Sequence, residues 1–101
     1  MDMVKFAAER GRVRSAMRRA RRAGRRAELE MHQWLYLLVV WHGRCAYCGR
    51  PFETLDHIVP LTNGGGTTKT NVLPCCTECN DAKGTAVWLP AAAGTGVTLR
   101  W

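Results

Sequence analysis

The stretch Leu55-Asp56-His57-Ile58-Val59-Pro60-Leu61 lies between two cysteine pairs, at Cys45–Cys48 and Cys76–Cys79. Its Asp-His dipeptide places an acidic oxygen beside an imidazole at the end of a short β-prone run. Such a pair can hold a divalent ion and activate a neighbouring water molecule. We therefore expect a catalytic loop that is fixed in place by a structural metal bound to the cysteines.

Both cysteine pairs have the Cys-x-x-Cys spacing that is typical of structural zinc sites. In the first pair, Gly49 follows directly and lets the turn tighten until both sulfurs face one ion. The 27 residues between the pairs are more than a compact zinc ribbon needs, so a further element is expected there. The alternatives are buried free thiols and a redox dithiol, but two pairs in so short a chain favour zinc. The predicted ligands are Cys45, Cys48, Cys76 and Cys79, with Cys75 as the spare cysteine.

The length of 101 residues predicts one domain with a small core. A chain of this size buries only about 60–65% of its unfolded surface and usually needs a metal or disulfide to support the fold. The charged N-terminus has no signal-peptide pattern, and the longest apolar run has eight residues, far fewer than the roughly 20 of a membrane span. We therefore expect a reducing compartment, the cytoplasm, with no membrane association and with the cysteines as metal ligands.

Positive charge is concentrated at the N-terminal end. Residues 1–30 contain ten basic and four acidic groups, whereas residues 31–101 contain five basic and four acidic groups, which together give the net charge of +7. Residues 3–23 have a weak apolar stripe at helical spacing, with arginines over the remaining surface. We predict a basic helical arm that is frayed until phosphates neutralise its like charges. A solvated charged helix and a transit peptide are the alternatives. The arginines predicted to bind nucleic acid are Arg14, Arg18, Arg21, Arg22 and Arg25.

The remaining elements are predicted from hydrophobic periodicity and from turn residues. Residues 28–42 indicate a helix with a wide apolar face, which Gly43 would end as its C′ residue. A helix that starts with Thr77 as N-cap should end at Gly84. Residues 52–59 and 71–74 read as strands around a flexible loop at 62–70, and residues 97–101 read as a strand or a packed tail.

Together, these motifs resemble those of an HNH endonuclease of the zinc-bound ββα-metal type. The resemblance covers about residues 30–85 and includes Cys-Ala-Tyr-Cys-Gly, Asp-His-Ile-Val-Pro-Leu, Asn-Val-Leu-Pro-Cys-Cys-x-x-Cys-Asn and a lysine. It implies that Asp56 is a catalytic metal ligand, that His57 is the general base and that Asn71 braces the loop so that His57 is aimed. Asn80 takes the place where the family often has its last histidine, and it would be the second metal ligand. Lys83 joins the residues expected to bind nucleic acid.

The resemblance implies hydrolysis of DNA phosphodiester bonds with Mg²⁺ or Mn²⁺ as the catalytic cation and Zn²⁺ as the structural one. It implies a small α+β fold with a ββα unit stapled by the four-cysteine zinc site, an N-terminal helix and a basic arm. The expected segments are an arm at 1–27, a nuclease domain at 28–89 and a tail at 90–101. Similar small proteins are encoded by phages, which would imply the host-cell cytoplasm and packaging partners such as terminase. A non-catalytic zinc-ribbon regulator that binds nucleic acid and a structural RNA-binding zinc module are the alternative interpretations.

Overall fold

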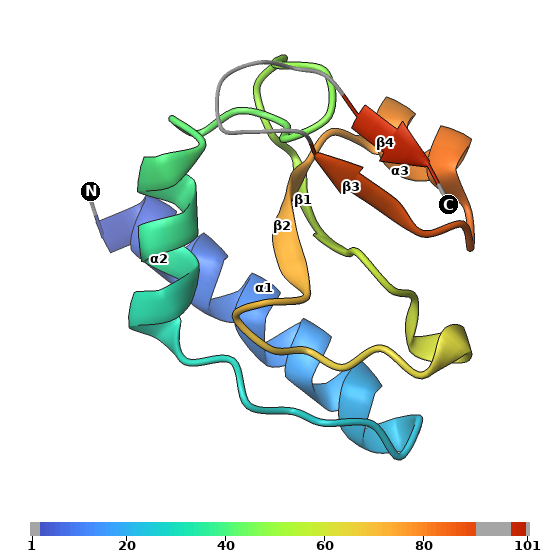
Figure 1. Ribbon diagram of the computed structural model, residues 1–101. Helices are drawn as coiled ribbons and strands as arrows, with labels where there is room; N and C mark the ends of the chain where they lie inside the picture. Colours follow the sequence, from blue (N-terminus) through green and yellow to red (C-terminus); the bar gives the residue numbers. More distant parts are fainter. Residues whose placement is uncertain (1–2, 91–97, 101) are drawn as a thin grey trace.

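The computed structural model describes residues 3–90 and 98–100 and places a short β-hairpin between two helical layers (Figure 1). The hairpin strands are β1 (Thr54–His57) and β2 (Val72–Cys75), which pair antiparallel with Asp56 opposite Leu73. Helices α1 (Met3–Arg22) and α2 (Met31–Val40) pack on one face of the hairpin, α1 mainly against β1 and α2 against β2. The hairpin and the following helix α3 (Thr77–Lys83) form the expected ββα unit. The predicted α+β class is confirmed.

Helix α1 begins and ends close to the predicted bounds, but it is an integral part of the core. Val13, Ala16 and Ala20 are buried on its inner face, so packing holds the helix in the absence of phosphates. The expected effect of phosphates on the fraying of this helix stays a prediction. The helix ends at Gly24, whose φ of 70° suits a left-handed C′ residue, and Arg25 N donates to Ala20 O.

A buried carboxylate fixes α1 against the rest of the fold. Glu9 is 7% exposed and accepts hydrogen bonds from Arg12 Nη1 at 2.7 Å and from Trp34 Nε1 of α2 at 3.0 Å. Arg12 in turn donates to Glu53 O at 2.9 Å and lies over the ring of Phe52. This network satisfies the buried polar groups and joins α1 to α2 and to the start of β1.

The apolar face predicted for α2 is confirmed, although two helix ends differ from the prediction. His42, rather than Gly43, takes the left-handed C′ position with a φ of 56°, and Gly43 N donates to Leu38 O. The N-cap of α3 is Cys76, rather than Thr77, because the Cys76 sulfur accepts from Cys79 N at 3.4 Å. The cysteine that begins the second pair therefore also starts the helix.

The hairpin separates two groups of buried side chains. The larger one joins the helices to one hairpin face: Val13, Ala16, Leu29, Trp34, Leu38, Leu55 and Val72. The other surrounds the cysteines on the opposite face: Cys45, Ala46, Tyr47, Leu73, Cys75, Cys76 and Trp88. Because side chains alternate along a strand, neighbouring residues of β1 contribute to different faces. This alternation places Asp56 and His57 among different neighbours.

A second two-stranded sheet follows α3 and covers the cysteine side of the molecule (Figure 1). It pairs β3 (Trp88–Pro90) with β4 (Thr98–Arg100) in antiparallel fashion, which confirms a strand near the C-terminus. Residues 91–97 of the predicted tail lie outside the described residues. Within the described part of the chain, no helix has both the length and the apolarity needed to cross a membrane.

Candidate active site and metal centre

The four predicted zinc ligands form one group. The sulfurs of Cys45, Cys48, Cys76 and Cys79 all lie within 4.8 Å of one another. Gly49 has a φ of 81°, which permits the predicted tight turn after the first pair. Cys75 stays outside the group and is fully buried, with its sulfur 3.2 Å from Cys76 O. The pairing of the two Cys-x-x-Cys motifs is therefore confirmed.

The protonation chemistry of these cysteines fits a structural dication. Burial and hydrogen bonds with the neighbouring cysteines raise the pKa of Cys79, and burial also raises the pKa of Cys48. Burial likewise opposes the thiolate of Cys45, but main-chain hydrogen bonds at Cys76, Tyr47 and Cys48 outweigh it and lower its pKa to about 7. Four thiolates this close repel one another unless a cation is present. A tetrahedral zinc ion removes that cost and uses all four sulfurs.

Asp56 lies on the cysteine side of β1 and is 7% exposed. The Tyr47 hydroxyl donates to Asp56 Oδ2 at 3.2 Å, and Lys83 Nζ of α3 lies 3.5 Å from the same oxygen. Burial raises the pKa of Asp56, while the charge of Lys83 and the Tyr47 hydrogen bond oppose that change. Both side-chain partners approach Oδ2, and the main chain at His57 also hydrogen-bonds to the carboxylate. These contacts fix the orientation of the Asp56 side chain.

His57 lies on the helix side of β1 and is 9% exposed. Its Nε2 is 2.8 Å from the hydroxyl of Thr67, and that hydroxyl donates to Ala16 O in α1 at 2.9 Å. Burial lowers the pKa of His57 to about 4, and the positive charges of Arg19 and Lys83 act in the same direction. The imidazole is therefore neutral near pH 7, which is the form that accepts a proton.

Asn71 ties together the two ends of the loop that follows His57. Its Nδ2 donates to Val59 O at 3.0 Å and to Gly66 O at 2.8 Å, and its Oδ1 accepts from Val59 N at 2.9 Å. Gly65 is required at this crossing, because a Cβ there would come within 1.8 Å of Val59 O. These contacts match the bracing that the resemblance implied for Asn71.

Asn80 and Lys83 are three residues apart on α3, so their side chains share one helix face. Lys83 marks the direction of that face, since its Nζ reaches Asp56 and also donates to His57 O at 2.8 Å. Asn80 is thus positioned on the side of α3 that faces β1. Lys83 itself is only 4% exposed and is engaged internally, so its assignment to nucleic-acid binding is corrected to a role in holding Asp56 and His57.

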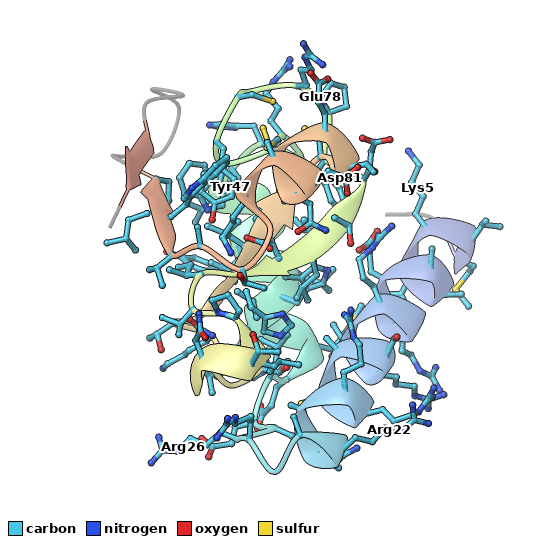
Figure 2. All side chains as sticks on the ribbon, turned by 90° about the vertical axis from the view of Figure 1, so that its right-hand side faces the viewer. Lys5, Arg22, Arg26, Tyr47, Glu78 and Asp81 are labelled. Carbon is cyan, nitrogen blue, oxygen red and sulfur yellow. The ribbon has the colours of Figure 1, made fainter. Side chains whose placement is uncertain are left out.

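Three of the predicted arginines gather along the outer face of α1. Arg14, Arg18 and Arg21 line a groove of about 420 Å³ whose floor includes Met17 and Leu29. In Figure 2, Arg22 and Arg26 lie at the lower end of the molecule, Glu78 lies at the upper end, and Asp81 and Lys5 lie in the upper half. The arginines at the end of α1 and in the loop after it therefore make the lower end basic.

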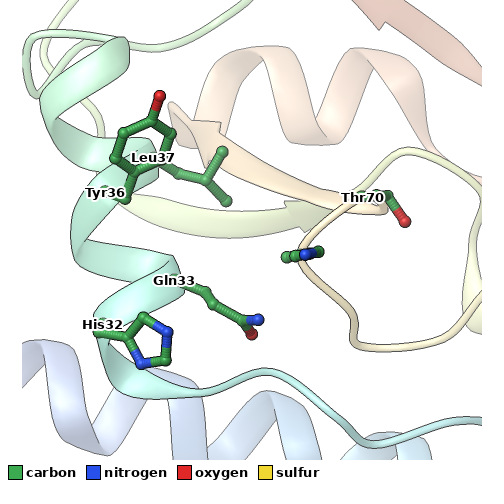
Figure 3. Close-up of a pocket in the computed structure, with 6 residues that line it drawn as sticks. His32, Gln33, Tyr36, Leu37 and Thr70 are labelled. Carbon is green, nitrogen blue, oxygen red and sulfur yellow. The ribbon is translucent and has the colours of Figure 1, made fainter.

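A separate pocket of about 520 Å³ lies between α2 and the loop at residues 69–70 (Figure 3). It is lined by His32, Gln33, Tyr36 and Leu37 of α2, with Lys69 and Thr70 opposite. None of the predicted catalytic or zinc-binding residues contributes to it. The pocket therefore does not belong to the site around Asp56 and His57.

Sequence reasoning missed four residues that shape the site. Thr67 and Tyr47 contact His57 and Asp56, Glu9 anchors α1, and Arg19 is an exposed residue whose charge acts on His57. Glu9 had a detectable signal, because it lies one helical turn before Val13 on the apolar stripe of α1. Thr67 had none, since it follows three glycines in a stretch that has the composition of a flexible loop.

Known proteins resemble the segment that contains the cysteine group, Asp56 and His57. Residues 45–86 match the HNH endonuclease family. Over 65 residues, 56% of the chain, the sequence is 37% identical to the CRISPR-associated endonuclease Cas9 of Corynebacterium diphtheriae. The match covers 6% of that protein, so the similarity concerns one domain of a much larger relative. Both matches support a nuclease domain and agree with the resemblance seen in the sequence.

Proposed function

We propose that the protein is a metal-dependent endonuclease that hydrolyses DNA phosphodiester bonds, on the basis of the match between residues 45–86 and the HNH endonuclease family. One observation carries the proposal beyond the family match. His57 is a buried, hydrogen-bonded imidazole that directly follows the buried carboxylate of Asp56, which points to the opposite face of β1. The end of this strand lies next to a zinc-type cysteine group. A non-catalytic binding module has no need for this arrangement.

In the proposed reaction, His57 removes a proton from the water molecule that attacks phosphorus. The lowered pKa of His57 keeps the ring uncharged at neutral pH, and the negative charge of a bound phosphate would raise this pKa toward the range that suits a general base. The charges of Arg19 and Lys83 that lower this pKa also favour a phosphate near the ring. These two effects support a base that works beside an anionic substrate.

Asp56 and Asn80 are the residues that would hold Mg²⁺ or Mn²⁺. Asp56 would offer its carboxylate, and Asn80 would offer an amide oxygen from the face of α3 that Lys83 shares. Oxygen ligands suit both cations, which also retain several waters. When bound, the cation supplies charge stabilisation for the phosphate oxygens. Tyr47 and Lys83 hold Asp56 in place, and Asn71 fixes the loop that starts two residues after His57.

The substrate class follows from the distribution of charge. Arg14, Arg18 and Arg21 form a basic groove that suits a phosphate backbone. Arg22 and Arg25 follow these residues in the sequence, and we retain all five arginines as the proposed nucleic-acid contacts. Partners such as phage terminase remain a prediction.

The test is incubation of supercoiled plasmid with pure zinc-loaded protein, with and without Mg²⁺ or Mn²⁺. We expect cutting only when one of these cations is added, and its loss in a His57→Ala variant that still binds DNA. His32→Ala is the matched control, because His32 is an exposed histidine of α2 whose change should leave cutting unaltered. DNA binding without cutting under every metal condition would instead favour the zinc-containing binding module.

A further inference from the structure

The hydrogen bonds around His57 decide which ring nitrogen carries the proton. The hydroxyl of Thr67 has a single hydrogen, and its two polar neighbours are Ala16 O at 2.9 Å and His57 Nε2 at 2.8 Å. A main-chain carbonyl only accepts hydrogen bonds, so both contacts can be hydrogen bonds only when the Thr67 hydrogen points at Ala16 O. The Thr67 oxygen is then an acceptor toward the ring. His57 must carry its proton on Nε2.

The other ring nitrogen is correspondingly available. Nε2 makes the single hydrogen bond of the His57 ring among the described residues. Every solvent-inaccessible side-chain nitrogen or oxygen in that part of the chain has a hydrogen-bond partner. Nδ1 therefore retains contact with solvent, and in the Nε2-protonated tautomer it has a lone pair to accept a proton.

We infer that Thr67 is a positioning residue that fixes His57 in the Nε2-protonated tautomer, so that Nδ1 is the basic atom. Thr67 is fully buried, and its own main chain is fixed by Thr67 N donating to Arg26 O and Glu28 N donating to Thr67 O. The threonine cannot turn away without breaking these contacts. A chain of two hydrogen bonds thus runs from the proposed base, His57, through the Thr67 hydroxyl to Ala16 O of helix α1.

This inference rests on the proposed function for its consequence, but its first test does not use activity. In ¹⁵N-labelled, zinc-loaded full-length protein, long-range ¹H–¹⁵N correlation spectra distinguish the two tautomers of a neutral histidine. His57→Gln assigns the His57 signals against those of His32 and His42. We expect the parent protein to show a protonated Nε2 and an unprotonated Nδ1. A protonated Nδ1 would overturn the inference, whether or not the protein cuts DNA.

A pair of Thr67 variants tests the consequence for catalysis. Thr67→Val keeps the shape but removes the hydroxyl, and we expect mixed His57 tautomers with a kcat lower by about 10–100-fold and little change in KM. Thr67→Ser restores the hydroxyl and should recover the Nε2-protonated signal and most of the rate. Thr62→Val, at an exposed position in the same loop, is the control. Retention of both the tautomer and the rate in Thr67→Val would refute the inference.

The combination of readouts separates this inference from the proposed nuclease activity. The predicted tautomer in a parent protein that never cuts DNA would reject the nuclease while leaving the role of Thr67 in fixing the ring intact. Cutting that depends on His57 but survives a change of tautomer would retain the nuclease and reject the role of Thr67. If Thr67→Val does not fold, the parent spectrum alone still decides which nitrogen is protonated.

Discussion

The cysteine group and the surroundings of His57 are both positioned by the hairpin β1–β2, but they are assembled from different numbers of chain segments. The cysteine group needs only two short motifs, at 45–48 and 76–79, each of which fixes its own two sulfurs. His57 depends on α1 through Ala16, on the glycine-rich loop through Thr67 and on α3 through Lys83. A locally encoded site can be recognised from spacing, whereas a site built from distant segments depends on the whole fold.

The largest expected effect comes from breaking the locally encoded site. Cys79→Ser removes one zinc ligand and should unfold the domain, because structural zinc contributes on the order of 10–16 kcal/mol of apparent binding. Elemental analysis and circular dichroism of the purified variant measure metal and fold together. Cys75→Ser is the control, since Cys75 lies outside the group and should retain one zinc per chain. A folded, zinc-free Cys79→Ser protein would refute the assignment.

The next largest effect is expected on the cutting rate, when a ligand of the proposed cation site is replaced. Asp56→Asn keeps the shape of the side chain but replaces a charged ligand with a weaker amide oxygen. We expect the cutting rate at fixed Mg²⁺ to fall by about a hundredfold or more, with partial recovery at higher Mg²⁺ or Mn²⁺. Asp81→Asn, at an exposed position of α3, should cut like the parent. A defect that no metal concentration relieves would count against Asp56 as a cation ligand.

Loss of the buried carboxylate that holds α1 in place should have a smaller effect, on the stability of the fold. Glu9→Ala leaves Trp34 Nε1 and Arg12 without their buried acceptor, and we expect the free energy of unfolding to fall by about 2–3 kcal/mol. Urea titration at saturating zinc measures the loss. Glu9→Gln retains an acceptor for Trp34 and should lose less. Equal stability of the parent and the Ala variant would show that α1 is held by other contacts.

The smallest effect on stability should come from replacing exposed arginines of α1. Replacing Arg14, Arg18 and Arg21 with Gln should leave stability nearly unchanged and weaken DNA binding at all sequences alike. Each lost phosphate contact reduces the log–log salt slope by about 0.9, so the triple variant should lose up to about 2.7. Fluorescence anisotropy over a range of salt concentrations measures the slope, with Arg50→Gln as the control. An unchanged slope would assign this face to another partner.

Much of the fold followed from local signals in the sequence. The grouping of four cysteines, the ββα order and both N-terminal helices were predicted, because cysteine spacing and apolar periodicity are properties of neighbouring residues. The errors at helix ends have a local physical cause. Cys76 uses its sulfur to cap α3 in place of Thr77, and His42 takes the C′ position that was assigned to Gly43, although both residues have a positive φ. Propensity alone does not decide between adjacent candidates.

The contacts around the candidate site could not be derived in the same way. Thr67 reaches His57 only because α1 packs across the hairpin and the loop returns beneath it, at a sequence separation of 51 residues from Ala16. The charge pattern of α1 did not reveal that Glu9 is buried against Trp34. Lys83 was likewise taken as a surface cation, although it is buried beside Asp56.

Single-turnover cleavage of a DNA duplex by His57→Ala, at saturating protein and matched Mg²⁺, tests the central claim most directly. A general base of this kind accounts for about 10²–10⁴ in rate, which corresponds to roughly 3–5.5 kcal/mol of barrier. We predict a fall of that size, with zinc content, fold and DNA affinity retained, and no recovery when Mg²⁺ or Mn²⁺ is raised. A His57→Ala protein that cleaves at the parent rate would contradict the assignment of His57 as the base.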